Sequence, residues 1–191
     1  MRRIIVGITG ATGVIYGIRL LKVLSDLHIE THAVISEAAK KNITIETNFT
    51  VEDVQKLAAH VYDEKNLAAS ISSGSFKTDG MVIAPCTIKT LSGIAHSYND
   101  NLIIRAADVM LKERRRLILV VRETPLHKGH LELMSQVAGF GGIILPPIPA
   151  FYYFPRTIDD LLDHTLGKIL DLLEIENALF TRWKGIDTPS A

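Results

Sequence analysis

Three short segments of this chain combine small residues, hydroxyls and cations in the way that proteins use to hold phosphate groups. They are residues 7–13 (GITGATG), 85–90 (PCTIKT) and 121–125 (VRETP). Small residues let backbone N–H groups approach an anion, hydroxyl and ammonium groups donate hydrogen bonds to it, and arginine binds phosphate in a bidentate manner. If the three segments meet in space, they form a site for a phosphorylated ligand.

The pattern of apolar residues predicts that the segments meet. The predicted strands span residues 4–8, 31–35, 81–84, 117–121 and 143–145, and the predicted helices span residues 15–27, 51–60, 102–112, 131–136 and 157–173, with one more helix starting at residue 37. Alternating strands and helices predict the α/β class with a doubly wound, Rossmann-like parallel sheet. The carboxyl ends of such strands share one rim, where ligands bind.

Composition limits the classes of function. The 191 residues contain 21 Lys and Arg and 21 Asp and Glu, so the net charge is zero and no nucleic-acid surface is expected. The sequence contains no apolar stretch of about 18 residues, so no membrane span is predicted, and we expect a cytoplasmic protein. We find no domain boundary and predict one domain over residues 1–191, with the terminal helix and tail from about residue 157 at a subunit interface.

The single cysteine, Cys86, excludes an intramolecular disulfide. We expect it to be a small buried residue and not a nucleophile, because the sequence places no base beside it. His127 and His130 stand three residues apart with no carboxylate or thiol patterned nearby, so no metal site is predicted there.

The first segment does not predict a dinucleotide site. Its glycines, at positions 7, 10 and 13, differ in spacing from the G-x-G-x-x-G fingerprint. The acidic residue that binds the ribose of NAD belongs at the end of the second strand, where this chain has Ser36. A serine at a helix N-terminus suits a phosphate better.

Two further groups of polar residues can each be interpreted either as part of a binding site or as structural ion pairs. Arg105, Asp108 and Lys112 lie on one face of a predicted helix, as either an anion site or a surface ladder of ion pairs. Glu123 follows Arg122 directly and is suited either to proton transfer or to a structural ion pair.

These motifs together resemble those of the UbiX-type flavin prenyltransferases, a family formerly described as aromatic-acid decarboxylases. The resemblance extends from Arg3 to about Trp183. It is carried by residues 7–13, 71–76, 85–91, 105–109, 111–114, 122–125, 149–152 and 182–183.

The resemblance implies a flavodoxin-like fold and a homododecamer with active sites between subunits. It also implies a metal-independent reaction in which dimethylallyl monophosphate alkylates reduced FMN at N5, followed by ring closure at C6 and release of phosphate. The product, prenylated FMN, then serves a UbiD-type decarboxylase, often in ubiquinone biosynthesis.

The same resemblance implies roles for individual residues. The residues expected to bind FMN are Gly10, Ala11, Thr12, Ser36, Thr87, Ile88, Lys89, Thr90 and Arg122. Those expected to hold the phosphate of the allyl substrate are Arg105, Lys112, Tyr152 and Lys168. Glu46 and Glu123 are expected to handle protons, and Trp183 to line the site. Thr12 stands where many members have Ser, and Lys168 where many have Arg.

Three other functions fit parts of the sequence. A flavin-dependent decarboxylase acting directly on a small or aromatic acid has the same fold, but the cysteine-decarboxylating flavoproteins carry a Pro-Ala-Ser-Ala-Asn-Thr segment that this chain lacks. Electron-carrying flavodoxin-like proteins tend to be acidic, whereas this chain is neutral. A structural oligomer with a vestigial site is disfavoured by the intact motifs.

Overall fold

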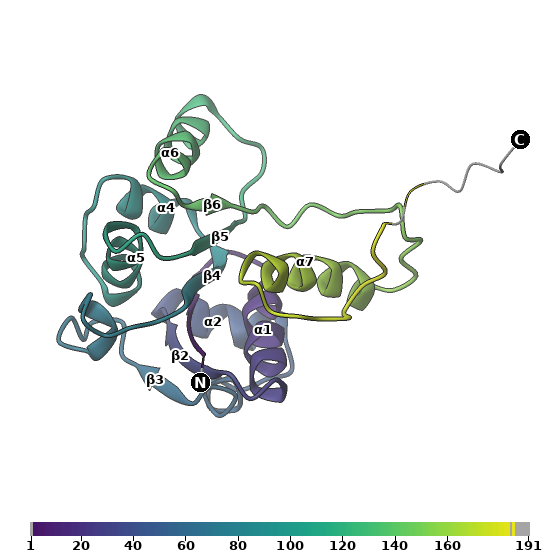
Figure 1. The fold of residues 1–191 in the computed structure, drawn as a ribbon, viewed down its shortest axis with the longest axis horizontal. Coiled ribbons are helices and arrows are strands. Elements are labelled where there is room, and N and C mark those ends of the chain that lie inside the picture. Colours follow the sequence, from purple (N-terminus) through teal and green to yellow (C-terminus); the bar gives the residue numbers. More distant parts are fainter. Residues whose placement is uncertain (1, 184, 186–191) are drawn as a thin grey trace, which may run out of the picture. The chain divides into compact units, whose positions relative to one another are not determined.

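In the computed structural model, which describes residues 2–183 and residue 185, the chain forms two compact units. The first unit, Met1–Pro147, contains a parallel sheet flanked by helices, and the second, Ile148–Ala191, contains a long helix with its flanking segments (Figure 1).

The sheet of the first unit has six strands in the order β3-β2-β1-β4-β5-β6, and every neighbouring pair is parallel. The strands are β1 (Arg3–Ile8), β2 (Glu30–Ile35), β3 (His60–Tyr62), β4 (Gly80–Cys86), β5 (Leu117–Val121) and β6 (Ile143–Ile144). The chain winds outward from β1 in one direction and from β4 in the other. The predicted doubly wound α/β class is confirmed, with its switch point between β1 and β4.

The helices are α1 (Val14–Asp26), α2 (Glu37–Glu46), α3 (Val51–Gln55), α4 (Ile88–Ala95), α5 (Leu102–Lys112), α6 (Lys128–Gly139) and α7 (Ile158–Leu172), with a 3-10 turn, η1 (Ser70–Ser72). Among the described residues, no helix combines the length and apolar character needed to cross a membrane.

The central strands are apolar on both faces because helices cover both. Ile5, Met81 and Leu119 belong to the core that also contains the apolar sides of α4 and α5. The alternate residues of the strands, such as Ile8 and Ala84, are also fully buried, and Gly17 of α1 packs directly against both. Such near-continuous apolar strands are typical of parallel sheets, in which no face meets water.

Side-chain caps fix where several helices begin. The Ser36 hydroxyl accepts a hydrogen bond from the Ala39 N–H at 3.2 Å, and this confirms the predicted cap of α2. Thr157 and Asp160 form the capping box predicted for α7, with a 3.1 Å bond from the Asp160 N–H to the threonine hydroxyl. Each cap satisfies backbone donors that the helix itself leaves unpaired.

The prediction of a helix over residues 51–60 was wrong in its second half. Helix α3 ends at Gln55, and His60–Tyr62 forms the edge strand β3. The Ala59 N–H donates to the Thr31 hydroxyl at 3.1 Å, and His60 pairs with His32 of β2. Pairing with β2 thus overrides the helical preference of the segment, a tertiary effect that local pattern does not report.

Two further boundaries differ from the prediction. Strand β4 continues through Pro85 to Cys86, because the Pro85 carbonyl accepts from the Thr9 N–H at 3.2 Å and no donor is required of the proline. Helix α6 is longer than predicted, since His127 caps it and it extends to Gly139.

Gly17 gives a test of the packing between α1 and β4. A Cβ at this position would lie 2.3 Å from the Ala84 carbonyl oxygen, which is backbone and has no room to move. We expect Gly17→Ala to lower the free energy of unfolding by about 1–3 kcal/mol. Thermal and urea unfolding would measure the change. The matched control is Gly139→Ala in α6, where no atom lies within 4 Å of the new Cβ. Equal stability of the two variants would contradict this packing.

Candidate functional site

The loops that follow β1 and β4 are joined at the switch point of the sheet. The Thr9 hydroxyl donates to the Pro85 carbonyl at 2.7 Å and accepts from the Thr87 N–H at 2.9 Å. Thr9 is 2% exposed, so these bonds are shielded from water. They hold the residues 7–13 segment against the residues 85–90 segment.

Backbone hydrogen bonds add the loops on either side. The Ser36 N–H, after β2, donates to the Ile8 carbonyl at 3.0 Å, and the Arg122 N–H, after β5, donates to the Cys86 carbonyl at 3.1 Å. Four loops therefore stand in a row along the carboxyl ends of β2, β1, β4 and β5. The convergence predicted from the sequence is present.

The loop between β1 and α1 is shaped by α2. The Asn42 side chain donates to the carbonyls of Gly10 and Ala11 at 3.0 and 3.2 Å. Gly10 has no space for a side chain, because a Cβ would lie 2.4 Å from that of Ala38. No described residue accepts a hydrogen bond from the N–H of Ala11 or Thr12. These donors are therefore available to an anion.

Glu46, at the end of α2, lies at the same loop. Its Oε2 atom accepts hydrogen bonds from the Gly13 and Val14 N–H groups at 2.8 and 3.3 Å. A carboxylate is stabilised at a helix N-terminus by these donors and by the helix dipole. The structure thus places Glu46 over the start of α1, on the rim that carries the predicted binding loops.

The loop after β4 presents hydroxyls at the start of α4. The Thr87 hydroxyl accepts from the Thr90 N–H at 3.1 Å and bonds to the Thr90 hydroxyl at 3.0 Å. Ile88 is half-buried, while Lys89 is exposed and lies 3.7 Å from an oxygen of Asp100. Within residues 87–90, Lys89 is thus the residue directed toward the connection between α4 and α5.

Cys86 is fully buried at the end of β4. Burial raises the pKa of its thiol, because the thiolate would lose its hydration. The expectation that Cys86 is a buried residue is confirmed, and nothing in its surroundings activates it as a nucleophile.

Arg122 and Glu123 extend the rim beyond β5. Arg122 is half-buried, and no described residue accepts a hydrogen bond from its guanidinium. Glu123 is exposed and its Oε1 atom accepts from the Thr124 N–H at 3.1 Å. A cation and a carboxylate therefore stand side by side at the rim, as the sequence indicated.

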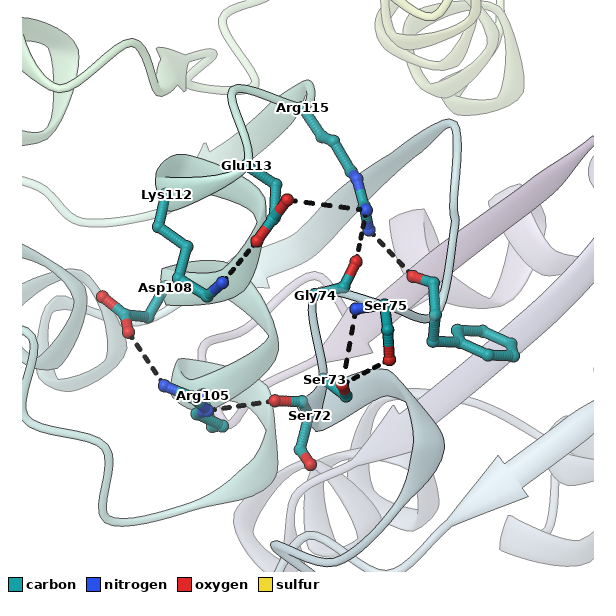
Figure 2. Close-up of polar contacts among 10 residues, drawn as sticks. Ser72, Ser73, Gly74, Ser75, Arg105, Asp108, Lys112, Glu113 and Arg115 are labelled. Atoms are coloured by element: carbon teal, nitrogen blue, oxygen red, sulfur yellow. Dashed lines mark hydrogen bonds and ion pairs between the residues drawn. The ribbon is translucent and has the colours of Figure 1, made fainter.

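The cations of α5 form a different group, arranged around the loop of residues 72–76 (Figure 2). Arg105 contacts the Asp108 carboxylate at 3.2 Å and donates to the Ser72 carbonyl at 3.1 Å. Lys112 pairs with Glu113, and this hydrogen bond lowers the pKa of the Glu113 carboxyl. The predicted common face of Arg105 and Lys112 is present, and it carries ion pairs as well as cations.

Arg115 and Gly74 complete the contact between this loop and α5. The Arg115 guanidinium donates to the carbonyls of Gly74 and Phe76 at 2.6 and 2.8 Å (Figure 2). A Cβ on Gly74 would lie 2.2 Å from Oε1 of Glu113, so a larger residue here would require the Glu113 side chain to move. The loop of residues 72–76 is thus held close to the cations of α5.

The position of Lys112 in the fold separates it from the rim of its own unit. Lys112 ends α5, and β5 begins only five residues later at Leu117. Lys112 therefore lies toward the amino ends of the strands, whereas Arg122 follows the carboxyl end of β5. Within the first unit, the structure therefore does not bring Lys112 and the binding loops together, whereas Arg105 lies near the start of α5.

The remaining predicted residues belong to the second unit. Tyr152 bonds through its hydroxyl to Nε2 of His164 at 2.9 Å, and its ring meets that of Trp183 edge-on at 5.8 Å. Lys168 is exposed on α7, one turn after His164. Tyr152 and Trp183 thus share one aromatic cluster, in which sequence reasoning had missed His164.

Thr9 and Asn42 were also missed by sequence reasoning. Thr9 lay inside a motif that was interpreted through its glycines, although its hydroxyl was a visible signal. Asn42 had no local signal, because its importance comes from two carbonyls more than 30 residues away.

Comparison with known proteins gives close matches. The family described as Flavoprotein matches residues 1–175 of the chain. Flavin prenyltransferase UbiX of Salmonella typhimurium is 56% identical over 188 residues, which cover 97% of this chain and 100% of that protein.

Two solved structures are similar over almost the whole chain. AnUbiX (PadA1), crystallised with FMN and dimethylallyl pyrophosphate, is 48% identical with a TM-score of 0.96, and the match covers 97% of this chain and 99% of that one. A dodecameric FMN-dependent UbiX-like decarboxylase from Escherichia coli O157:H7 is 47% identical with a TM-score of 0.94, covering 96% and 100%.

Thr9 gives a test of how the rim is held together. Thr9→Val keeps the shape of the side chain but removes its hydroxyl and leaves the Thr87 N–H without that acceptor. We expect a loss of about 1–3 kcal/mol in the free energy of unfolding, measured by urea unfolding. Thr12→Val is the matched control, since its exposed hydroxyl has no described partner. If Thr9→Val were as stable as the control, the hydroxyl would not join the two loops.

Proposed function

The chain belongs to the UbiX family of flavin prenyltransferases, and from this premise we propose that it joins the dimethylallyl group of dimethylallyl monophosphate to N5 and C6 of reduced FMN. The observation that carries the proposal is the row of four loops at the carboxyl ends of β2, β1, β4 and β5.

The rim has the donors that the FMN phosphate needs. Helices α1, α2 and α4 all begin there, and helix N-termini favour anions. The N–H groups of Ala11 and Thr12 and the guanidinium of Arg122 have no described acceptor. Ser36 and Thr87 add hydroxyls, and Thr90 and Ile88 follow on α4. The residues present therefore fit FMN, with Gly10 giving the loop its close approach to α2.

A second anion site is required for the allyl phosphate. Arg105 and Lys112 supply it from α5, and Tyr152 and Lys168 supply it from the second unit. Because Lys112 lies away from the rim of its own unit, we propose that a neighbouring subunit provides the two α5 cations, Arg105 and Lys112. The dodecameric assembly of a relative with a TM-score of 0.94 supports a homododecamer of this chain.

Reduced FMN supplies the nucleophilic N5 atom and the C6 carbon when it is bound. Transfer breaks the C–O bond of the allyl phosphate, and the electron pair leaves with the phosphate. Arg105, Lys112 and Lys168 stabilise the charge that develops on this leaving group. Aromatic faces such as those of Tyr152 and Trp183 stabilise positive charge on the allyl carbon.

Two carboxylates are available for the proton transfers. Glu123, beside Arg122, donates a proton to the departing phosphate. Glu46, held by the Gly13 and Val14 N–H groups, accepts the proton that leaves when the new ring closes at C6. Their different settings, one exposed beside a cation and one on helix donors, support different roles.

The product, prenylated FMN, is a cofactor and not an end product. We propose that it passes in the cytoplasm to a UbiD-type decarboxylase, in keeping with a role in ubiquinone biosynthesis. No metal ion enters the proposed chemistry.

The direct test is an anaerobic incubation of the protein with reduced FMN and dimethylallyl monophosphate. We expect mass spectrometry of the released flavin to show the addition of one dimethylallyl-derived group, with one phosphate formed for each flavin. A reaction without added allyl phosphate is the control. An unmodified flavin after complete reduction would overturn the proposed function.

The sharing of the site between subunits gives a second prediction. Arg122→Ala and Lys112→Ala should each lose most single-turnover prenylation, through the FMN site and the substrate site respectively. Oligomers that contain both variants should regain on the order of a quarter of the sites, because some sites then combine Arg122 of one chain with Lys112 of another.

The control for this experiment is a mixture of Arg105→Ala with Lys112→Ala. Both residues lie on α5 of one chain, so mixing should restore nothing. Differently tagged chains, co-expressed and purified through both tags, ensure that mixed oligomers are measured. No recovery in the first mixture would mean that Arg122 and Lys112 act within one chain.

A further inference from the structure

The amino ends of β2 and β3 carry a cluster of ligating side chains that the flavin chemistry does not use. Glu30 and His32 are two residues apart on β2, so they lie on the same face of the sheet. His60 of β3 is the direct register partner of His32. The cluster lies at the opposite end of the strands from the FMN rim.

The three side chains converge on one point. Oε1 of Glu30 lies 3.1 Å from Nε2 of His32 and 3.5 Å from Nε2 of His60. All three ligand atoms lie within 4.8 Å of one another. In a tetrahedral zinc site with metal–ligand bonds of about 2.0–2.1 Å, two ligand atoms are separated by roughly 3.3 Å. The two separations to Glu30 thus already bracket the value that zinc requires.

We propose that Glu30, His32 and His60 form a binding site for a divalent transition metal, with zinc as the best match. Two imidazoles and one carboxylate are a recurrent zinc donor set. The proposal is independent of the flavin chemistry and assigns the metal no part in it.

The surroundings orient the ligands as the second shell of a metal site does. Nδ1 of His32 lies 2.9 Å from the Tyr62 hydroxyl, which in turn lies 3.1 Å from the Ser70 hydroxyl. When Nε2 of His32 binds a metal, Nδ1 carries the proton and donates it to Tyr62, which then donates to Ser70. In this series of hydrogen bonds, the His32 Nδ1 atom and the Tyr62 hydroxyl each have a partner.

The carboxylate is oriented in a similar way. Arg3 donates to Oε2 of Glu30 at 3.0 Å, so that Oε1 is the atom presented to the histidines. The Arg3 guanidinium also lies 5.2 Å from the centre of the Phe76 ring. Phe76 meets His32 edge-on with ring centres 5.1 Å apart. The positions of Glu30 and His32 are therefore fixed by the hydrogen bond from Arg3 and by packing against Phe76.

The site is closed on one side and open on the other. The side chains of His32 and Glu30 are 3% and 13% exposed, whereas that of His60 is 53% exposed. The rings of His32 and His60 are stacked with centres 4.7 Å apart, so binding of one metal by both Nε2 atoms requires the exposed ring of His60 to rotate. The open side admits the ion and leaves a fourth position for water.

A plain network of ion pairs is the competing explanation, since Glu30 also contacts Arg3. The hydrogen bond from Arg3 lowers the pKa of Glu30 and so favours the charged carboxylate under either explanation. His127 and His130, with ring centres 3.5 Å apart, are a competing location. That pair belongs to no group of three ligating side chains among the described residues.

The experiment uses the full chain without a polyhistidine tag, freed of metal by a chelator and then titrated with zinc chloride in a calorimeter. We expect one saturable site for each chain. His60→Ala should weaken zinc binding by about tenfold or more, because one of three protein ligands is lost. Glu30→Gln should weaken it as well. Cobalt(II) in place of zinc should give the visible absorption of a tetrahedral site in the wild type only.

Two controls accompany this experiment. His96→Ala removes an exposed histidine outside the cluster and should leave zinc affinity unchanged. His60→Ala should also retain prenylation of FMN, since it lies far from the rim, and this shows that the variant is folded. The absence of saturable binding, unchanged affinity in His60→Ala, or loss of binding in His127→Ala would each overturn the proposal.

Discussion

The buried hydroxyl of Thr9 is the constraint on which the site depends. It connects the ends of β1 and β4, the two strands between which the sheet changes its direction of winding. A parallel sheet alone aligns its strands but leaves the loops beyond them free to diverge. With Thr9 bound to both Pro85 and Thr87, the starts of α1 and α4 are held together. The N-termini of two helices are thereby held at the same part of the rim.

The sequence was sufficient for the parts of the fold that depend on local pattern. The boundaries of β5 and α5 agree with the prediction, because an apolar run and an amphipathic stripe are both contained in a few neighbouring residues. The grouping of Ser36, Thr87 and Arg122 on one rim was also predicted, since it follows from parallel strands. What the pattern could not report was contact at long range, such as the bonds from Asn42 to two carbonyls of another loop.

One error of prediction had a chemical consequence. Residues 56–60 were interpreted as the end of a helix, and in a helix His60 has no defined relation to β2. As part of β3 it pairs with His32 in register, which brings a second imidazole to Glu30. The sequence contains all three residues of the proposed ligand set, but nothing in its local pattern indicates that they lie together. It arises from strand register, which is a property of the sheet and not of any segment.

The same topology supports the proposal that the prenyl-transfer site is shared between chains. The connection from β4 to β5 contains two helices, α4 and α5, and it must return the chain to the amino end of β5, so the end of α5 lies toward that end of the sheet. Lys112 therefore lies away from the rim of its own unit. Lys112 pairs with Glu113 and its side chain is 47% exposed, so it is accessible from outside the unit. The proposed second anion site is therefore one that this chain would complete by association with another copy.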